Sequence, residues 1–146
     1  MKEIILSREA YLEHNNLVKQ IIGAAIEVHR ELGPGLLTEA YEYCLKIELE
    51  RRGMRVETHI DQPLYYKGRD TGKFFTLDML VENKIIVDLK AVDEITPIHE
   101  SQMVSYLRLT QKAIGLIINF NVALLKDGVK RKMNAKVEDE NDSTNS

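Results

Sequence analysis

Cysteine, tryptophan and aromatic residues in general are scarce in this sequence, and their scarcity excludes several classes of protein. The 146 residues include one cysteine, Cys44, no tryptophan, six tyrosines and three phenylalanines. A single thiol excludes an internal disulfide framework and a zinc cluster built from cysteines. Because aromatic residues are few, the core must consist mainly of leucine, isoleucine and valine.

Long apolar runs are also missing. No run of 18 apolar residues occurs, so no membrane span is expected. Residues 1–8 lack the apolar segment and cleavage site of a secretory signal, which favours a cytoplasmic protein. The segment Gly33-Pro34-Gly35 is too short for a phosphate-binding loop and is not followed by Lys-Ser/Thr, which disfavours a nucleotide cofactor.

The negative charge of the chain is concentrated at its end. The formal net charge is −3, but Glu138–Ser146 carries four acidic residues and no basic one. Without that segment, 19 acidic residues stand against 20 basic ones. The body of the protein is therefore close to neutral, and its composition does not exclude a nucleic-acid partner.

Length and patterning predict one domain, with 44% hydrophobic residues to form its core. We divide the chain into an N-terminal lead (1–15), a folded domain (16–136) and an acidic disordered tail (137–146). Apolar residues at steps of three and four predict a helix from Asn16 that ends at Gly33, and a second over 38–52. Thr96-Pro97 opens a third helix that runs to about residue 109.

Strands are predicted where the apolar pattern changes to a period of two residues. The ranges are 56–60, 64–66, 74–81 and 85–91, with residues 67–72 as a loop and 82–84 as a tight turn. The apolar run 113–120 is typical of a central strand that is covered on both faces. This order of elements predicts an α/β or α+β domain built on a mixed sheet.

The strongest chemical signal lies on the two strands around the 82–84 turn. Asp88 and Lys90 are two residues apart, so they project from one face of a strand. A hairpin about the turn brings Asp78 close to the level of Asp88. Two carboxylates hold a Mg²⁺ ion well, and the ammonium group can position water or stabilise developing negative charge. The alternative is that Asp88 and Lys90 are simply ion partners at a solvated sheet edge.

Two further groups of residues are candidates for a supporting role. His99, Gln102 and Tyr106 share one face of the third predicted helix, where they bind phosphate, brace a neighbouring site, or merely form a polar surface. Near the C-terminus, a run of basic residues predicts nucleic-acid contacts or an ordinary solvated edge. Its central members are Lys130, Arg131 and Lys132.

Several blocks of the sequence resemble known proteins. Asp78, then Asp88-Leu89-Lys90, then Gln102-Met103-Val104-Ser105-Tyr106 is similar to the PD-(D/E)XK nuclease superfamily, with a QxxxY element like that of its RecB-like branch. Longer blocks resemble the small bacterial GxxExxY proteins within it. These blocks are residues 25–37, 81–92 and 115–120.

The resemblance implies a restriction-endonuclease-like fold, with a mixed central sheet flanked by helices. It also implies a nuclease that hydrolyses phosphodiester bonds, most naturally in DNA, with Mg²⁺ or substituting Mn²⁺. Asp78, Asp88 and the carbonyl of Leu89 would be metal ligands, and Lys90 the catalytic lysine. Gln102 and Tyr106 would support the site or contact the substrate. Cys44, by contrast, is expected to be a packing residue.

One position departs from the family pattern. In Gly35-Leu36-Leu37-Thr38-Glu39-Ala40-Tyr41, the slot of the signature glutamate holds Thr38, which cannot supply a negative charge. Glu42 lies one turn on, on the face of Thr38, and can substitute as a metal ligand or remain an exposed helix charge. This departure leaves open a second function, in which a weakened or inactive nuclease fold binds nucleic acid or a protein partner.

Overall fold

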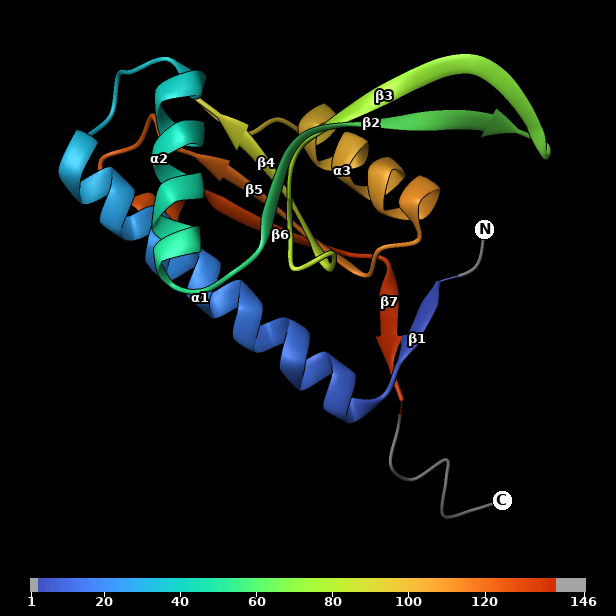
Figure 1. Ribbon diagram of the computed structural model, residues 1–146. Helices are drawn as coiled ribbons and strands as arrows, with labels where there is room; N and C mark the ends of the chain where they lie inside the picture. The colour runs from blue at the N-terminus through green and yellow to red at the C-terminus, as the bar shows by residue number, and fades with distance from the viewer. Residues whose placement is uncertain (1–2, 139–146) are drawn as a thin grey trace.

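A computed structural model describes residues 3–138 of the chain (Figure 1). Its three α-helices are α1 (Arg8–Leu32), α2 (Thr38–Arg51) and α3 (Pro97–Thr110), and a 3₁₀-helix, η1, spans Leu125–Gly128. The strands are β1 (Ile4–Leu6), β2 (Val56–Tyr66), β3 (Arg69–Val81), β4 (Ile85–Lys90), β5 (Ile114–Asn119), β6 (Val129–Met133) and β7 (Ala135–Val137).

The central sheet has five strands in the order β2-β3-β4-β5-β6. Only β4 and β5 run parallel, and the other three pairs are antiparallel, so the sheet is mixed. Helix α3 provides the crossover between the two parallel strands, as parallel neighbours require. The predicted α/β class with a restriction-endonuclease-like mixed sheet is confirmed.

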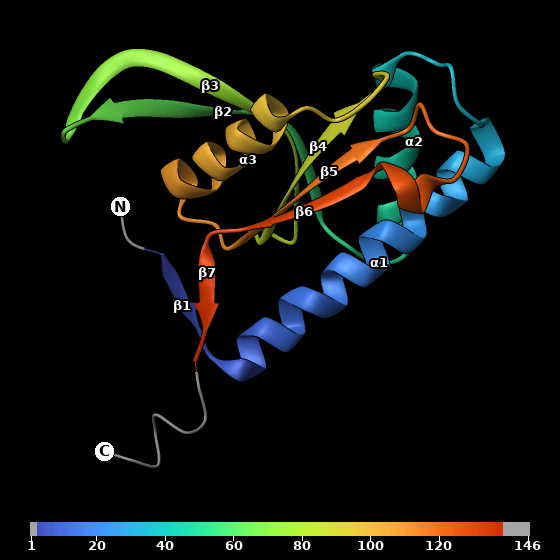
Figure 2. The ribbon, with the colours of Figure 1, turned by 180° about the vertical axis from the view of Figure 1, so that it is seen from behind.

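Helices cover both faces of the sheet (Figures 1 and 2). Helices α1 and α2 pack on one face, where buried side chains such as Ile21 and Leu45 meet Val87 and Leu116. On the other face, α3 inserts Met103 and Leu107 against strand residues that include Ile86 and Ile117. All six residues of β5 are buried, which confirms the prediction of a central strand that is covered on both faces.

The beginning of α1 differs from its prediction at Asn16. The helix starts eight residues earlier, because the Ser7 side chain accepts a hydrogen bond from the Ala10 amide (3.0 Å) and caps it. Strand β1 precedes it and pairs in parallel with β7. The predicted division at residue 15 therefore falls inside α1, and Val137 ends a strand. The remaining tail residues, 139–146, lie outside the described part of the chain.

Strands β2 and β3 are longer than predicted. The proline at 63 does not interrupt β2, because β2 is an edge strand and Pro63 needs no amide partner on its outer side. The predicted 67–72 loop shrinks to a two-residue turn at Lys67 and Gly68, and β3 begins at Arg69. The edge strand β6, in the segment 121–136, was not predicted. Its three consecutive basic residues, 130–132, interrupt the alternation of apolar and polar residues that marks a strand. Among residues 3–138, no helix is long and apolar enough to cross a membrane.

Candidate active site

The pairing of β3 with β4 sets the position of the two candidate carboxylates. The ladder runs from Val81–Ile85 at the turn to Met79–Val87, where it ends. One further step in this register places Asp78 opposite Asp88. Beyond this point β3 leaves β4 and continues with β2 alone, so the two carboxylates lie where the sheet divides. The hairpin geometry thus brings together the two aspartates that the sequence singled out.

The closeness of the two carboxyl groups alters the acidity of Asp88. Burial, then the hydrogen bond with Asp78 and the repulsion from its charge, raise the pKa of Asp88 to about 7, although Lys90 opposes the shift. Only 9% of Asp88 is exposed. A buried carboxylate beside a half-buried one needs either a shared proton or a cation, because two negative charges in contact repel strongly. The pair therefore has the chemistry of a cation site.

Main-chain groups of β4 complete the space between the two strands. The Leu89 amide donates a hydrogen bond to Oδ2 of Asp78 (3.1 Å) in place of the missing ladder partner. In a strand, the amide and carbonyl of one residue point to the same side, so the Leu89 carbonyl also faces the gap beside Asp78. Two carboxylates and a carbonyl are the oxygen ligands that Mg²⁺ accepts, with water filling its remaining positions. The residues present fit such an ion.

Lys90 stands beside this pair, at the end of β4. Its Nζ lies 3.3 Å from Oδ2 of Asp88, and 22% of its side chain is exposed. The ammonium group is thus paired with the site and accessible to an incoming anion. Its backbone is held in place as well, because the Phe120 amide donates to the Lys90 carbonyl (3.0 Å). The structure therefore brings Asp78, Asp88 and Lys90 together.

Asn119 is a positioning residue that the sequence did not reveal. It lies opposite Lys90 in the β4–β5 register and is 2% exposed. Its side-chain oxygen accepts from the Val92 amide (3.1 Å), and its amide nitrogen donates to the Val92 carbonyl (2.8 Å). Asn119 thereby fixes the chain directly after Lys90. The one available signal was a buried amide inside an otherwise apolar run, since such a group must find partners.

Helix α3 carries Tyr106 close to the site. The Tyr106 ring stacks on Phe75 of β3, with centroids 5.2 Å apart. Burial, followed by the charges of Asp88 and Asp78, raises the pKa of the Tyr106 phenol, which keeps it a hydrogen-bond donor. Gln102, one turn earlier, is exposed. His99 serves in the capping box of α3 with Thr96. Of the helical candidates, Tyr106 is the one whose electrostatics couple it to the carboxylates.

Glu42 has a partner outside the carboxylate pair. Its carboxylate contacts the His59 imidazole, and this contact is an ion pair only when the imidazole is protonated. His59 lies opposite Asp78 in the β2–β3 register and has a left-handed backbone (φ 52°), which interrupts the ladder there. Within residues 3–138, no set of three or more His, Cys, Asp or Glu side chains is placed to hold a metal ion. Thr38, the departure from the signature, is the first residue of α2.

The signature tyrosine has a structural role. Tyr41 is fully buried and stacks on Phe120 at 4.4 Å. Its hydroxyl donates to the Gly33 carbonyl (2.6 Å) and accepts from the Leu36 amide (3.1 Å). Tyr41 therefore fastens the α1–α2 connection to the core, which explains why a buried phenol is needed at this position.

The three basic candidates of β6 do not form one patch. Asp88, Ile117 and Lys130 are successive partners across β4, β5 and β6, so the exposed Lys130 shares the face of the site. Lys132 is on that face too, but it pairs with Glu100 (3.3 Å). Arg131 points to the opposite face, where Nη1 contacts Oδ1 of Asn15 (2.6 Å). Of these three residues, Lys130 is therefore the one that is exposed on the site face and has no acidic partner such as Glu100.

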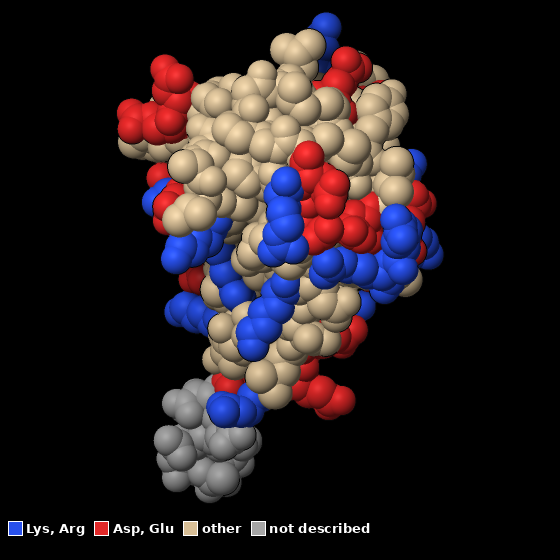
Figure 3. Space-filling model, turned by 90° about the vertical axis from the view of Figure 1, so that its left-hand side faces the viewer, with Lys and Arg blue, Asp and Glu red and all other residues tan. Residues whose placement is uncertain are grey.

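Charges of both signs are mixed on the surface. On the face shown in Figure 3, acidic side chains gather near the centre and Lys and Arg side chains surround them. Neither sign covers the face, which agrees with the nearly neutral body of the chain. Binding of a polyanion must therefore depend on particular side chains.

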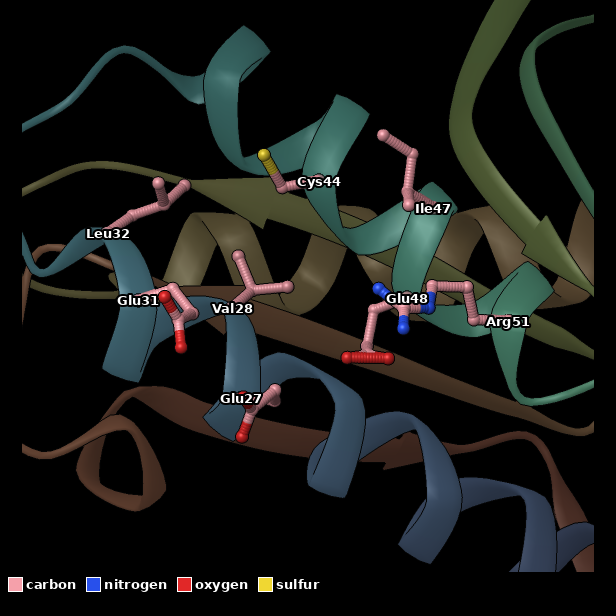
Figure 4. Close-up of a pocket in the computed structure, with 8 residues that line it drawn as sticks. All are labelled: Glu27, Val28, Glu31, Leu32, Cys44, Ile47, Glu48 and Arg51. Carbon is pink, nitrogen blue, oxygen red and sulfur yellow. The ribbon is translucent and has the colours of Figure 1, made fainter.

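Cys44 lies away from the carboxylate pair, in a pocket of about 330 Å³ between α1 and α2 (Figure 4). Its side chain is half-buried, so it is a packing residue that also borders a hollow. The pocket is lined by both apolar and charged side chains. Its lining consists of Glu27, Val28, Glu31, Leu32, Cys44, Ile47, Glu48 and Arg51.

One comparison with known proteins gives a match. The family model described as PD-(D/E)XK nuclease superfamily matches residues 15–132. The match covers both aspartates, Lys90, α3 and almost the whole folded body. No curated protein and no solved structure shows a significant match to the chain.

Proposed function

Because the chain belongs to the PD-(D/E)XK nuclease superfamily, whose nucleases act on nucleic acid and generally use divalent metal ions, we propose that it is a metal-dependent DNA nuclease. The observation that carries this proposal is the contact between Asp78 and Asp88 beside Lys90. Within the superfamily, we assign the chain to the bacterial GxxExxY proteins of the RecB-like QxxxY branch. The blocks 25–37, 81–92 and 115–120 and the Gln102–Tyr106 spacing support this assignment, whereas Thr38 departs from the signature.

Asp78, Asp88 and the Leu89 carbonyl are the proposed metal ligands, and Mg²⁺ the proposed ion, with Mn²⁺ as its substitute. When bound, the ion supplies positive charge that lowers the pKa of water and polarises a phosphoryl oxygen. The chain holds the two carboxylates ready: the Leu89 amide fixes Asp78, and the β-ladder fixes Asp88. Glu42 is a further proposed ligand, which requires that it release His59.

Lys90 is the proposed catalytic lysine. Hydrolysis joins the oxygen of one water to phosphorus and breaks one P–O ester bond. One proton of that water ends on the leaving hydroxyl, and the other is released. Negative charge accumulates on the phosphoryl oxygens during this exchange, and a partly exposed ammonium group beside Asp88 is positioned to stabilise it. Tyr106, kept protonated, and the exposed Gln102 are proposed to donate hydrogen bonds to the substrate or to the site.

Lys130 is the proposed contact to phosphate on the far side of the site, three strands from Asp78. Lys132 would join it after leaving Glu100. Arg131 is a weaker candidate, because its side chain packs against α1. A phosphate contact of this kind positions the strand but does not read its sequence.

The test is a cleavage assay on DNA with Mg²⁺ or Mn²⁺, comparing the wild type with Asp88→Ala and Lys90→Ala. Loss of cleavage in both variants supports the proposal. Cleavage that survives both substitutions overturns the proposal, because the alanine variants lack the proposed metal ligand or the proposed catalytic ammonium group.

A second function is favoured by the Thr38 position and by the pairing of Glu42 with His59. In this case the chain is a weakened or inactive nuclease fold that binds nucleic acid or a protein. Metal titration separates the two functions: intact DNA affinity without any stabilisation by Mg²⁺ or Mn²⁺ favours the second.

A further inference from the structure

The outer part of β2 and β3 forms a two-stranded hairpin that projects from the sheet. We call residues 62–75 the hairpin arm. Strand β3 pairs with β4 only from Met79 to Val81, so its earlier residues pair with β2 alone and the arm has no third strand. Figures 1 and 2 show it extending past α3, away from α1 and α2. A two-stranded ribbon without a third strand gains little stability of its own, so its surface invites a functional explanation.

Three large aromatic rings are exposed on the hairpin arm. The exposed fractions are 55% for Tyr65, 66% for Tyr66 and 66% for Phe74. An aromatic ring has a large area to bury and gains most when its face is covered. The β2–β3 register places Tyr65 and Phe74 on one face of the ribbon and Tyr66 on the other, so both faces carry exposed rings. Three exposed rings on so short a ribbon indicate a binding surface.

Positive charge accompanies these rings. Residues 62–75 contain Lys67, Arg69 and Lys73 but only one acidic residue, Asp70. Asp70 is used locally, because its Oδ1 accepts a hydrogen bond from the Gly72 amide (2.9 Å). Lys67 lies over the Tyr66 ring, with its Nζ 5.4 Å from the centroid. Rings and cations together fit a polymer that carries both flat bases and phosphates.

The tip of the hairpin arm is braced from within. Thr71 donates through its hydroxyl to the Leu64 carbonyl (2.7 Å) and accepts from the Lys73 amide (3.1 Å). These bonds span the register shift between Leu64 and Tyr65. The rings are thus presented on an ordered scaffold, which lowers the entropy cost of binding.

The hairpin arm connects directly to the candidate active site. At its inner end Phe75 stacks on Tyr106, whose phenol is within the electrostatic reach of Asp78 and Asp88. With a rise of about 3.3 Å per residue, Phe74 lies roughly 13 Å and the tip roughly 30 Å along β3 from Asp78. A strand bound along the face of the arm that carries Tyr66 and Phe75 therefore runs toward the carboxylates.

We propose that an unpaired stretch of the DNA substrate wraps around the hairpin arm, with bases stacked on Tyr66 on one face and on Tyr65 and Phe74 on the other, and phosphates against Lys67 and Arg69. The identity of the polymer rests on the proposed function. Unpaired bases are favoured over a duplex because their faces are open to aromatic rings, whereas paired bases present theirs to one another.

The test measures binding of a fluorescent single-stranded oligonucleotide of about 15 nucleotides, a length typical of such sites. Fluorescence anisotropy is recorded without added metal, so that cleavage does not interfere. The arm variants are Tyr65→Ala/Tyr66→Ala and Phe74→Ala. Tyr65→Phe/Tyr66→Phe is the matched control because it keeps both rings. Lys67→Ala is compared with Lys19→Ala, which removes an exposed lysine from α1.

The double alanine variant is expected to weaken single-strand binding about tenfold or more, while the double phenylalanine variant binds like the wild type. Lys67→Ala should bind more weakly than Lys19→Ala and show a smaller salt dependence. A duplex of the same sequence should respond less to the loss of the rings. Unchanged melting temperatures confirm that the variants fold.

Two results would overturn the proposal. In one, the double alanine variant binds single strands as well as the wild type does. In the other, the wild type is a dimer that this variant dissociates without any change in DNA affinity. Cleavage assays are run separately. If binding depends on the rings but the protein does not cleave DNA, only the proposed nuclease activity is refuted. If the protein cleaves DNA but binding does not depend on the rings, only the role of the arm is refuted.

Discussion

Replacing Asp88 by asparagine should make the metal-free protein more stable at pH 8 while removing its response to metal. Asp88 is buried and in hydrogen-bond contact with Asp78, and these surroundings raise its pKa to about 7. In the unfolded chain the same carboxyl has its ordinary pKa, 3.8. Between these values the folded state holds a proton that the unfolded state has lost. Stability from this group is therefore full below about pH 4 and is lost as pH rises through about 7.

The magnitude follows from the two pKa values. A difference of about three pH units corresponds to a ceiling of roughly 4 kcal/mol, lost by pH 8. Asparagine has no charge to bury, so it avoids this cost, but it gives up the ion pair with Lys90. We expect a net gain of about 2 kcal/mol, which for a domain of this size raises Tm by about 5 °C.

Thermal unfolding at pH 5 and pH 8, with and without Mg²⁺, measures this effect. The Tm of Asp88→Asn should be higher than that of the wild type at pH 8 and close to it at pH 5. Mg²⁺ should not raise the Tm of this variant. Glu50→Gln, which removes one exposed acidic charge from α2, is the control and should change little. A variant clearly less stable than the wild type at pH 8 without metal would refute the reasoning, because the carboxylate pair would then stabilise the fold.

Five other outcomes are expected. Lys90→Ala should lower kcat by about 10² or more in a cleavage assay, and at pH 8 it should also lower Tm by a few degrees in a melting curve, because buried Asp88 loses its ion partner. Mg²⁺ or Mn²⁺ should raise the wild-type Tm more at pH 8 than at pH 5.5, because the ion competes with the proton on Asp88. Arg131→Ala should lower the free energy of unfolding by about 1 kcal/mol through loss of its bond to Asn15, whereas Lys130→Ala should weaken DNA binding in a titration at fixed salt and leave stability unchanged. Gly128→Ala should destabilise the fold by several kcal/mol in denaturant unfolding, because a Cβ there would lie 2.2 Å from the Asn119 carbonyl oxygen.

Local sequence was sufficient to identify most elements of the fold. The Thr96-Pro97 pair marks the start of α3 because a side-chain cap and a proline both suit the first turn of a helix. The apolar run of β5 identifies a central strand because only a strand covered on both faces is apolar at every position. The beginning of α1 was missed because its first two turns have few apolar residues, and their helical state depends on the Ser7 cap.

The candidate site was partly visible in the sequence. The two-residue spacing of Asp88 and Lys90, with the short turn after Asp78, was enough to predict that the three side chains converge. Asn119 was hidden within an apolar run, and the Glu42–His59 pair joins α2 to β2. Contacts of this kind depend on how separate elements pack, and no periodicity records them.

The sequence by itself determined the class of the fold, the order of its main elements and the aspartate–lysine cluster, because these depend on periodicity and on short spacings along the chain. It also showed that the chain has little excess charge for holding a polyanion without selectivity. Only the tertiary structure decided that β3 leaves β4 at Asp78, that Arg131 and Lys130 face opposite sides of the sheet, and that three aromatic rings stand on a projecting arm. These features depend on strand pairing and on which faces are covered, and both are set by residues far apart in the chain.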